Sequence, residues 1–108
     1  MTWGIDMRRL CLTIAVTALG AAPAFGDEIT RGKELASRWC VGCHVIAPNT
    51  PGGDVGPPFP AVAAEPYQSE TALKAWLADP HPPMPDLNLS APEFDALAAY
   101  IMSLKPTD

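Results

Sequence analysis

The regular stretches of this chain place their hydrophobic residues at helical spacing. The segment from about Glu28 to Trp39 is interrupted only by Gly32. Its apolar positions are Ile29, Leu35, Ala36 and Trp39. No stretch shows the period-two alternation of apolar and polar residues that is typical of a half-buried strand. The pattern therefore predicts an all-α fold.

Two further helices are predicted from their ends. Ser69 can cap a helix over residues 70–78, and the Asp79-Pro80 pair ends it because a residue before proline avoids the helical region. Ser90 and the glutamate three residues later form an S-x-x-E capping box, which begins a helix that runs to about residue 104. The apolar stripe of this last helix is Leu97, Tyr100, Ile101 and Leu104.

The segments between these helices are rich in proline and glycine. Residues 48–66 predict a loop without a regular element, and residues 80–85 predict a stiff, extended loop. The expected architecture is three to four short helices joined by long loops. Loops of this length are uncommon in a small domain unless they are functional, and a large rigid ligand for them to wrap would explain them.

The amino terminus has the order of a secretory signal peptide. Two arginines precede an apolar run over residues 10–22, and small residues follow. The run is shorter than the roughly 20 apolar residues that span a bilayer, so no stable membrane span is expected after cleavage. Cleavage after Gly26, or alternatively after Ala24, would remove residues 1–26. Met7 directly precedes the arginines and is a second possible start.

The remaining segment, residues 27–108, is small and acidic. It carries five basic and eleven acidic residues, a formal net charge of −6. This charge argues against a protein that binds nucleic-acid phosphates. An apolar core is marginal in a chain of 82 residues, so a metal, a cofactor, disulfides or a partner is expected to supplement it.

One motif carries specific chemistry. Cys40-Val41-Gly42-Cys43-His44 is C-x-x-C-H, the pattern of covalent c-type haem attachment. Two thiols three positions apart lie on one face of a helical turn and can add to the two vinyl groups of one porphyrin. The histidine that follows is carried under the ring as the proximal iron ligand.

Other chemistries of this motif stay open at this stage. A structural zinc site needs four ligands, and the only other histidine is His81. A thioredoxin-like C-x-x-C needs a βαβ context, which the pattern does not show. A disulfide between Cys40 and Cys43 is possible in an exported chain but leaves His44 unexplained.

The second axial ligand is expected to be Met84. It lies 40 residues after His44, in a loop that prolines restrict before binding. His/Met is a standard axial pair in cytochromes c. His81 is the rival ligand, whereas Met102 is expected to project away from the buried stripe. A metal-bound histidine normally donates its other ring nitrogen to an acceptor, for which the Gly56-Pro57 backbone is a candidate.

Taken in order, these features resemble a class I c-type cytochrome of the small bacterial monohaem kind, over essentially all of residues 27–108. The resemblance rests on five features: C-V-G-C-H at 40–44, Gly32 eight residues before it, Gly56-Pro57, Met84-Pro85, and Ala-Tyr-Ile at 99–101. The first is highly specific, and the others are informative in this order. The resemblance implies the cytochrome c fold wrapped around one covalently attached haem c.

The resemblance also implies roles for single residues. Gly32 lets the first helix approach the last one, with Tyr100 packed at the crossing, and the Pro57 carbonyl accepts a hydrogen bond from His44. The implied pocket residues are Trp76, Leu73 and Leu77, with Phe59, Val62 and Leu87 as weaker candidates. The chain departs from the family at Ala36, where many members carry an aromatic residue. That contact is expected to be weaker, or to be filled by Trp39.

The function that follows is that of a periplasmic electron carrier rather than an enzyme. Cofactor-binding residues would be Cys40, Cys43, His44, Pro57, Trp76 and Met84, with His44 and Met84 as iron ligands. Redox partner proteins with a basic docking patch are expected, among them a periplasmic dehydrogenase or a terminal oxidase. The alternatives are a dedicated electron-transfer subunit of a periplasmic dehydrogenase, and a haem enzyme or sensor with an open sixth site.

Overall fold

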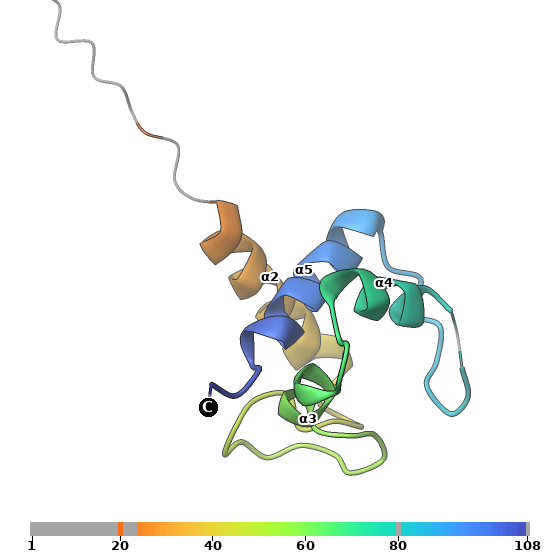
Figure 1. Ribbon diagram of the computed structural model, residues 1–108. Helices are drawn as coiled ribbons and strands as arrows, with labels where there is room; N and C mark the ends of the chain where they lie inside the picture. Colours follow the sequence, from red (N-terminus) through yellow and green to blue (C-terminus); the bar gives the residue numbers. More distant parts are fainter. Residues whose placement is uncertain (1–19, 21–23, 80, 108) are drawn as a thin grey trace, which may run out of the picture.

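The computed structural model describes residues 20, 24–79 and 81–107, which form a bundle of short helices with long connecting loops (Figure 1). The helices are α2 (Ala24–Trp39), α3 (Phe59–Ala64), α4 (Glu70–Ala78) and α5 (Ala91–Ser103). No strand occurs in these ranges. The all-α prediction is confirmed, and the ends of α4 and α5 lie within a residue of those predicted.

The expected signal peptide falls almost entirely outside the described residues. Since α2 begins at Ala24, the expected boundary near Ala24–Gly26 lies within the first turn of that helix. Among the residues described, no helix has both the length and the apolar character needed to cross a bilayer.

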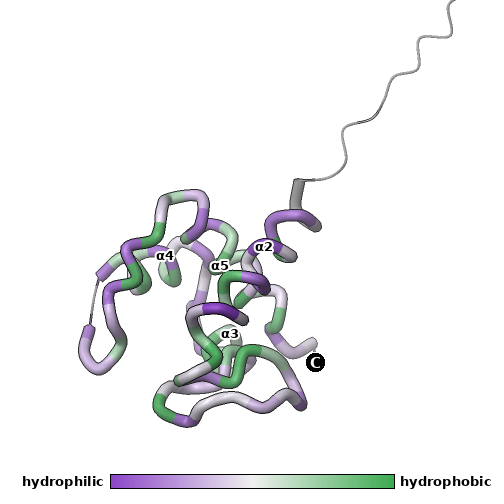
Figure 2. Tube along the Cα trace, turned by 180° about the vertical axis from the view of Figure 1, so that it is seen from behind, coloured by the Kyte–Doolittle hydropathy of each residue, from purple (hydrophilic) through white to green (hydrophobic). Residues whose placement is uncertain are grey.

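Helix α5 forms the centre of the bundle. Every residue from Ala96 to Ile101 is buried, and α2, α3 and α4 all pack against this helix. Leu104, the end of the predicted stripe, is half-buried. The outer turns of α2 are hydrophilic, while hydrophobic stretches gather around α3 and α5 (Figure 2). The core therefore surrounds α5 on several sides, instead of lying along one stripe of it.

Gly32 sets how closely α2 approaches α5. A Cβ atom at this position would overlap the backbone oxygen of Ala96 and would lie 2.6 Å from Cβ of Tyr100. Any larger side chain would push the helices apart, so the expected close crossing is confirmed. Ala36, one turn further along α2, is completely buried.

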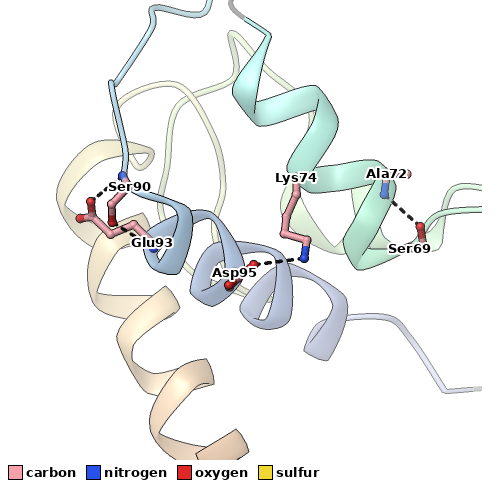
Figure 3. A network of polar contacts seen from close by, with 6 residues as sticks. All are labelled: Ser69, Ala72, Lys74, Ser90, Glu93 and Asp95. Carbon is pink, nitrogen blue, oxygen red and sulfur yellow. Dashed lines mark hydrogen bonds and ion pairs between the residues drawn. The ribbon is translucent and has the colours of Figure 1, made fainter.

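Side-chain caps define the starts of α4 and α5, and an ion pair joins the two helices (Figure 3). The Ser69 hydroxyl accepts a hydrogen bond from the Ala72 backbone N–H, 3.0 Å away. Ser90 and Glu93 form the predicted reciprocal capping box. Hydrogen bonds from the Ser90 backbone and hydroxyl lower the pKa of Glu93, with Arg31 and Arg38 of α2 adding to the effect. Lys74 of α4 pairs with Asp95 of α5 at 3.1 Å.

The prediction of an unbroken loop over residues 48–66 is wrong at α3. Proline is tolerated in the first turn of a helix, where its missing N–H needs no partner. Pro58 is the N-cap of α3 and Pro60 lies in its first turn. Phe59 and Ala63 are buried against the core. The prolines at the start of this six-residue helix are therefore compatible with it, and burial of Phe59 and Ala63 stabilises it.

Tyr100 ties the central helix to the chain that follows the C-x-x-C-H motif. Its buried hydroxyl donates to the Ile46 carbonyl oxygen at 2.7 Å, while burial raises the pKa of Tyr100. The Cβ atom of Tyr100 lies at the Gly32 crossing. One side chain therefore links α2, α5 and the segment after His44.

We expect Tyr100→Phe to lower the free energy of unfolding by about 1–2 kcal/mol, because the Ile46 carbonyl would remain buried without its donor. Tyr67→Phe is the matched control, since the Tyr67 side chain is fully exposed and should tolerate the same change without loss. Urea unfolding, followed by circular dichroism, measures the free energy of unfolding of both variants. Equal stabilities of the two variants would show that the Tyr100 hydroxyl has no structural role.

Candidate functional site

The C-x-x-C-H motif continues α2 as a further helical turn. The Cys40 N–H donates to the Ala36 carbonyl at 2.9 Å, and the N–H groups of Cys43 and His44 donate to the Cys40 carbonyl at 3.1 and 2.9 Å. Both cysteines and the histidine border the same cavity. The predicted arrangement of two thiols on one face of a turn is therefore present.

The proline- and glycine-rich loop folds back onto this turn through its backbone. The Gly56 N–H donates to the Cys43 carbonyl at 2.8 Å, and the Phe59 N–H donates to the Val45 carbonyl at 2.8 Å. A loop without an element of its own thus gains order from the motif it covers. These bonds also bring Pro57 beside His44.

The imidazole of His44 is held from three sides. Its Nδ1 lies 2.8 Å from the Pro57 carbonyl oxygen. Because a carbonyl only accepts, Nδ1 carries the proton and Nε2 is left as the free nitrogen. The Phe59 ring packs at 5.2 Å between centroids, tilted by 46°. Gly56 leaves room for the ring, since a Cβ there would lie 2.7 Å from Nδ1.

A cavity of about 340 Å³ lies between this turn, α4, α5 and the loop that precedes α5. This volume lies within the range of roughly 300–1,000 Å³ that is usual for ligand pockets. All six predicted site residues border it: Cys40, Cys43, His44, Pro57, Trp76 and Met84. Both the firmer and the weaker pocket candidates border it as well: Leu73, Leu77, Phe59, Val62 and Leu87.

Met84 and His81 reach the cavity together from the loop after α4. Both side chains are half-buried, and the Met84 backbone N–H donates to the His81 carbonyl at 2.9 Å. The fold thus brings Met84 to the cavity that holds His44, 40 residues earlier in the chain. Met102 was expected to project away from the buried stripe, but it is half-buried and packs against the core. It is not among the described residues that border the cavity.

Some cavity residues were assigned differently from the sequence, or missed. Trp39 was expected on the apolar face of its helix and as a filler of the crossing, yet it is 53% exposed and borders the cavity. Its position as the last residue of α2, directly before Cys40, explains this. Val55 also borders the cavity, and its loop gave no signal for this role. Leu97 and Ile101 were predicted as core, and they supply cavity wall as well.

The two cysteines differ in their surroundings. Cys40 is buried and Cys43 is exposed, and the two are not joined to each other. Burial, with a smaller contribution from the neighbouring Cys43, raises the pKa of the Cys40 thiol to about 11. Thiol–disulfide chemistry uses cysteines whose pKa is lowered, so this environment argues against a redox dithiol.

A zinc site receives no support from the described residues. Nowhere in residues 24–79 and 81–107 do three or more His, Cys, Asp or Glu side chains gather as a metal site requires. The cavity offers two thiols, two imidazoles and a thioether on otherwise mainly apolar walls. Thiols, imidazole and thioether are the protein groups that attach and ligate haem c, and an apolar wall suits the flat macrocycle.

Comparison with known proteins agrees with this donor set. The family profile described as "Cytochrome C oxidase, cbb3-type, subunit III" matches residues 27–101. Cytochrome c-552 of Bradyrhizobium diazoefficiens is 41% identical over 104 residues, covering 94% of this chain and 98% of that protein. The chain belongs to this family of c-type cytochromes.

As a member of the family, the chain is an electron-carrying monohaem cytochrome with covalently bound haem c. No solved structure matches the chain. The resemblance found in the sequence is confirmed, and so is the helical fold that it implies. The roles of individual residues rest on the geometry described above.

We expect Gly56→Ala to destabilise the haem-bound protein by about 1–3 kcal/mol, because the added methyl group would overlap the His44 ring and force it or the loop to move. Gly42→Ala is the matched control, since a Cβ at Gly42 meets no atom within 4 Å. Guanidinium unfolding of both variants compares them. A Gly56→Ala protein as stable as the control would mean that the His44 ring does not depend on this glycine.

Proposed function

We propose that this protein is a periplasmic monohaem electron carrier, with His44 and Met84 as axial ligands and Cys40 and Cys43 as the attachment points. One observation carries the proposal: a single cavity joins the C-x-x-C-H turn to Met84, a residue from a distant loop. The haem, when bound, supplies one-electron chemistry between the ferric and ferrous states. We propose no catalytic residue.

The chain's own residues would tune the site in three ways. The Pro57 carbonyl holds the His44 ring and makes its free nitrogen more basic. The Met84 thioether is a weak, soft ligand that favours the reduced state and so raises the potential. Apolar side chains of α4 and α5 that border the cavity would exclude water from a haem bound there. With both axial positions filled by protein, no substrate needs to reach the metal.

The proposed location and partners follow from the sequence and charge. An exported chain is expected from the arrangement of residues 1–26, and export is compatible with covalent haem attachment. The net charge of −6 on residues 27–108 favours a partner that presents basic residues. Encounters between such partners are brief and small in area, and they weaken as ionic strength rises.

We expect Met84→Leu to abolish the weak red-edge iron–thioether absorption band and to lower the reduction potential, with covalent haem attachment intact. Leucine replaces methionine at nearly equal volume, so packing is preserved while the sulfur is lost. Met102→Leu is the matched control and should keep both the band and the potential. Visible spectra measure the band, and potentiometric titration measures the reduction potential. A Met84→Leu protein with an unchanged band would remove Met84 from the ligand role.

A second candidate is a dedicated subunit that stays attached to a larger redox enzyme. The description of the matching family profile, which names an oxidase subunit, favours this candidate.

For the diffusing carrier, we expect the protein to purify alone from periplasmic extract at high ionic strength, because contacts between oppositely charged surfaces are screened there. Size-exclusion chromatography of the haem-bound protein measures this. Stable co-elution with an oxidase or dehydrogenase at high salt would favour the subunit over the diffusing carrier.

A further inference from the structure

The cavity contains a second imidazole whose setting matches that of His44. His81 Nδ1 lies 2.8 Å from the Asp79 carbonyl oxygen, just as His44 Nδ1 lies 2.8 Å from that of Pro57. A carbonyl only accepts, so in the neutral form of each ring the proton is on Nδ1 and the lone pair is on Nε2. Histidines that ligate metals almost always have this arrangement, with the other ring nitrogen donating to a fixed acceptor.

Two further contacts restrain His81. Its ring packs against Trp76 at 4.1 Å between centroids, tilted by 50°, and Trp76 borders the cavity too. The His81 carbonyl accepts the Met84 backbone N–H, so the two residues belong to the same hydrogen-bonded turn. Because both residues lie in this one turn, the Met84 thioether and the His81 imidazole reach the cavity together.

We propose that His81 is a reserve axial ligand, whose Nε2 binds the haem iron when the Met84 thioether is removed. The proposal rests on the proposed function, in which Met84 is the resident ligand. The exchange replaces an iron–sulfur bond with an iron–nitrogen bond. It moves no electron. Starting from the neutral imidazole, whose Nδ1–H tautomer the Asp79 contact selects, it also moves no proton. His81 would then fill the coordination position that Met84 leaves, so small ligands would not reach the iron, and the reduction potential would be lower.

A plain structural role for His81 is the competing explanation. Asp79 is the C-cap of α4, and a histidine side chain near the end of a helix can satisfy a terminal carbonyl. Asparagine keeps a side-chain donor for this carbonyl but has no nitrogen that ligates iron. His81→Asn therefore separates the two roles, and it should leave the iron–thioether band unchanged when Met84 is present.

The test compares haem-bound Met84→Ala with the double variant His81→Asn/Met84→Ala at one fixed pH. We expect Met84→Ala to be low-spin in ferric electron paramagnetic resonance, and the double variant to be high-spin. Carbon monoxide should bind the ferrous double variant at least about tenfold more tightly than it binds ferrous Met84→Ala. In Met84→Ala, His81 would occupy the iron, and the apparent affinity falls in proportion to the fraction of protein whose iron is open. Added free imidazole should restore the low-spin spectrum of the double variant.

Each other outcome contradicts the proposal in a recognisable way. If both variants are high-spin and bind carbon monoxide equally, His81 only caps α4. If both are low-spin, another residue supplies the ligand. If Met84→Ala keeps the iron–thioether band, the assignment of Met84 fails together with the reserve role of His81. This last result can be told apart from the first two because only there does Met84→Ala show the iron–thioether band.

Discussion

The close crossing of α2 over α5 at Gly32 is the constraint on which the rest of this structure depends. The C-x-x-C-H turn continues directly from the end of α2, and the cavity wall is supplied partly by α5. The spacing between these helices therefore sets the spacing between the cysteines and that wall. Tyr100 acts at the same place, since it packs on Gly32 and bonds the chain just after His44. A side chain at Gly32 would disturb the crossing and the site together.

The loop between the motif turn and α3 is ordered by its hydrogen bonds to the turn that it covers. Backbone hydrogen bonds from Gly56 and Phe59 attach the middle loop to the motif turn. This attachment brings the Pro57 carbonyl to the imidazole that it orients. Prolines remove conformational freedom from this loop before any contact forms, which reduces the entropy lost on folding. A chain with a small core can thus keep a long loop, because the loop positions a side chain of the site.

Much of this was predictable from the sequence, because the decisive signals are local. The helix ends at Ser69 and at Ser90 follow from side-chain capping, which depends on residues three apart. The C-x-x-C-H turn carries its chemistry within five residues. The gathering of Met84 with His44 was predictable from the family resemblance, although spacing alone does not determine it.

The remainder depended on tertiary contacts. Helix α3 is stabilised by the burial of Phe59 and Ala63, which the local sequence does not reveal. Trp39 leaves the helix core because α2 ends at the cavity. The bond from Tyr100 to Ile46 joins residues 54 positions apart, and no pattern in either segment marks it. The contact between His81 and Trp76 likewise depends on how the chain turns after α4.

The two histidines show how one local rule acts in two different parts of the fold. In each, a backbone carbonyl takes the Nδ1 proton and leaves Nε2 free. For His44 the carbonyl comes from a loop residue 13 positions away, so the orientation of the ring depends on how that loop folds onto the motif turn. For His81 the carbonyl is two residues back along the chain, so a single turn is enough. The imidazole beside Met84 can therefore be oriented locally, and its readiness to bind iron does not require that Met84 be in place.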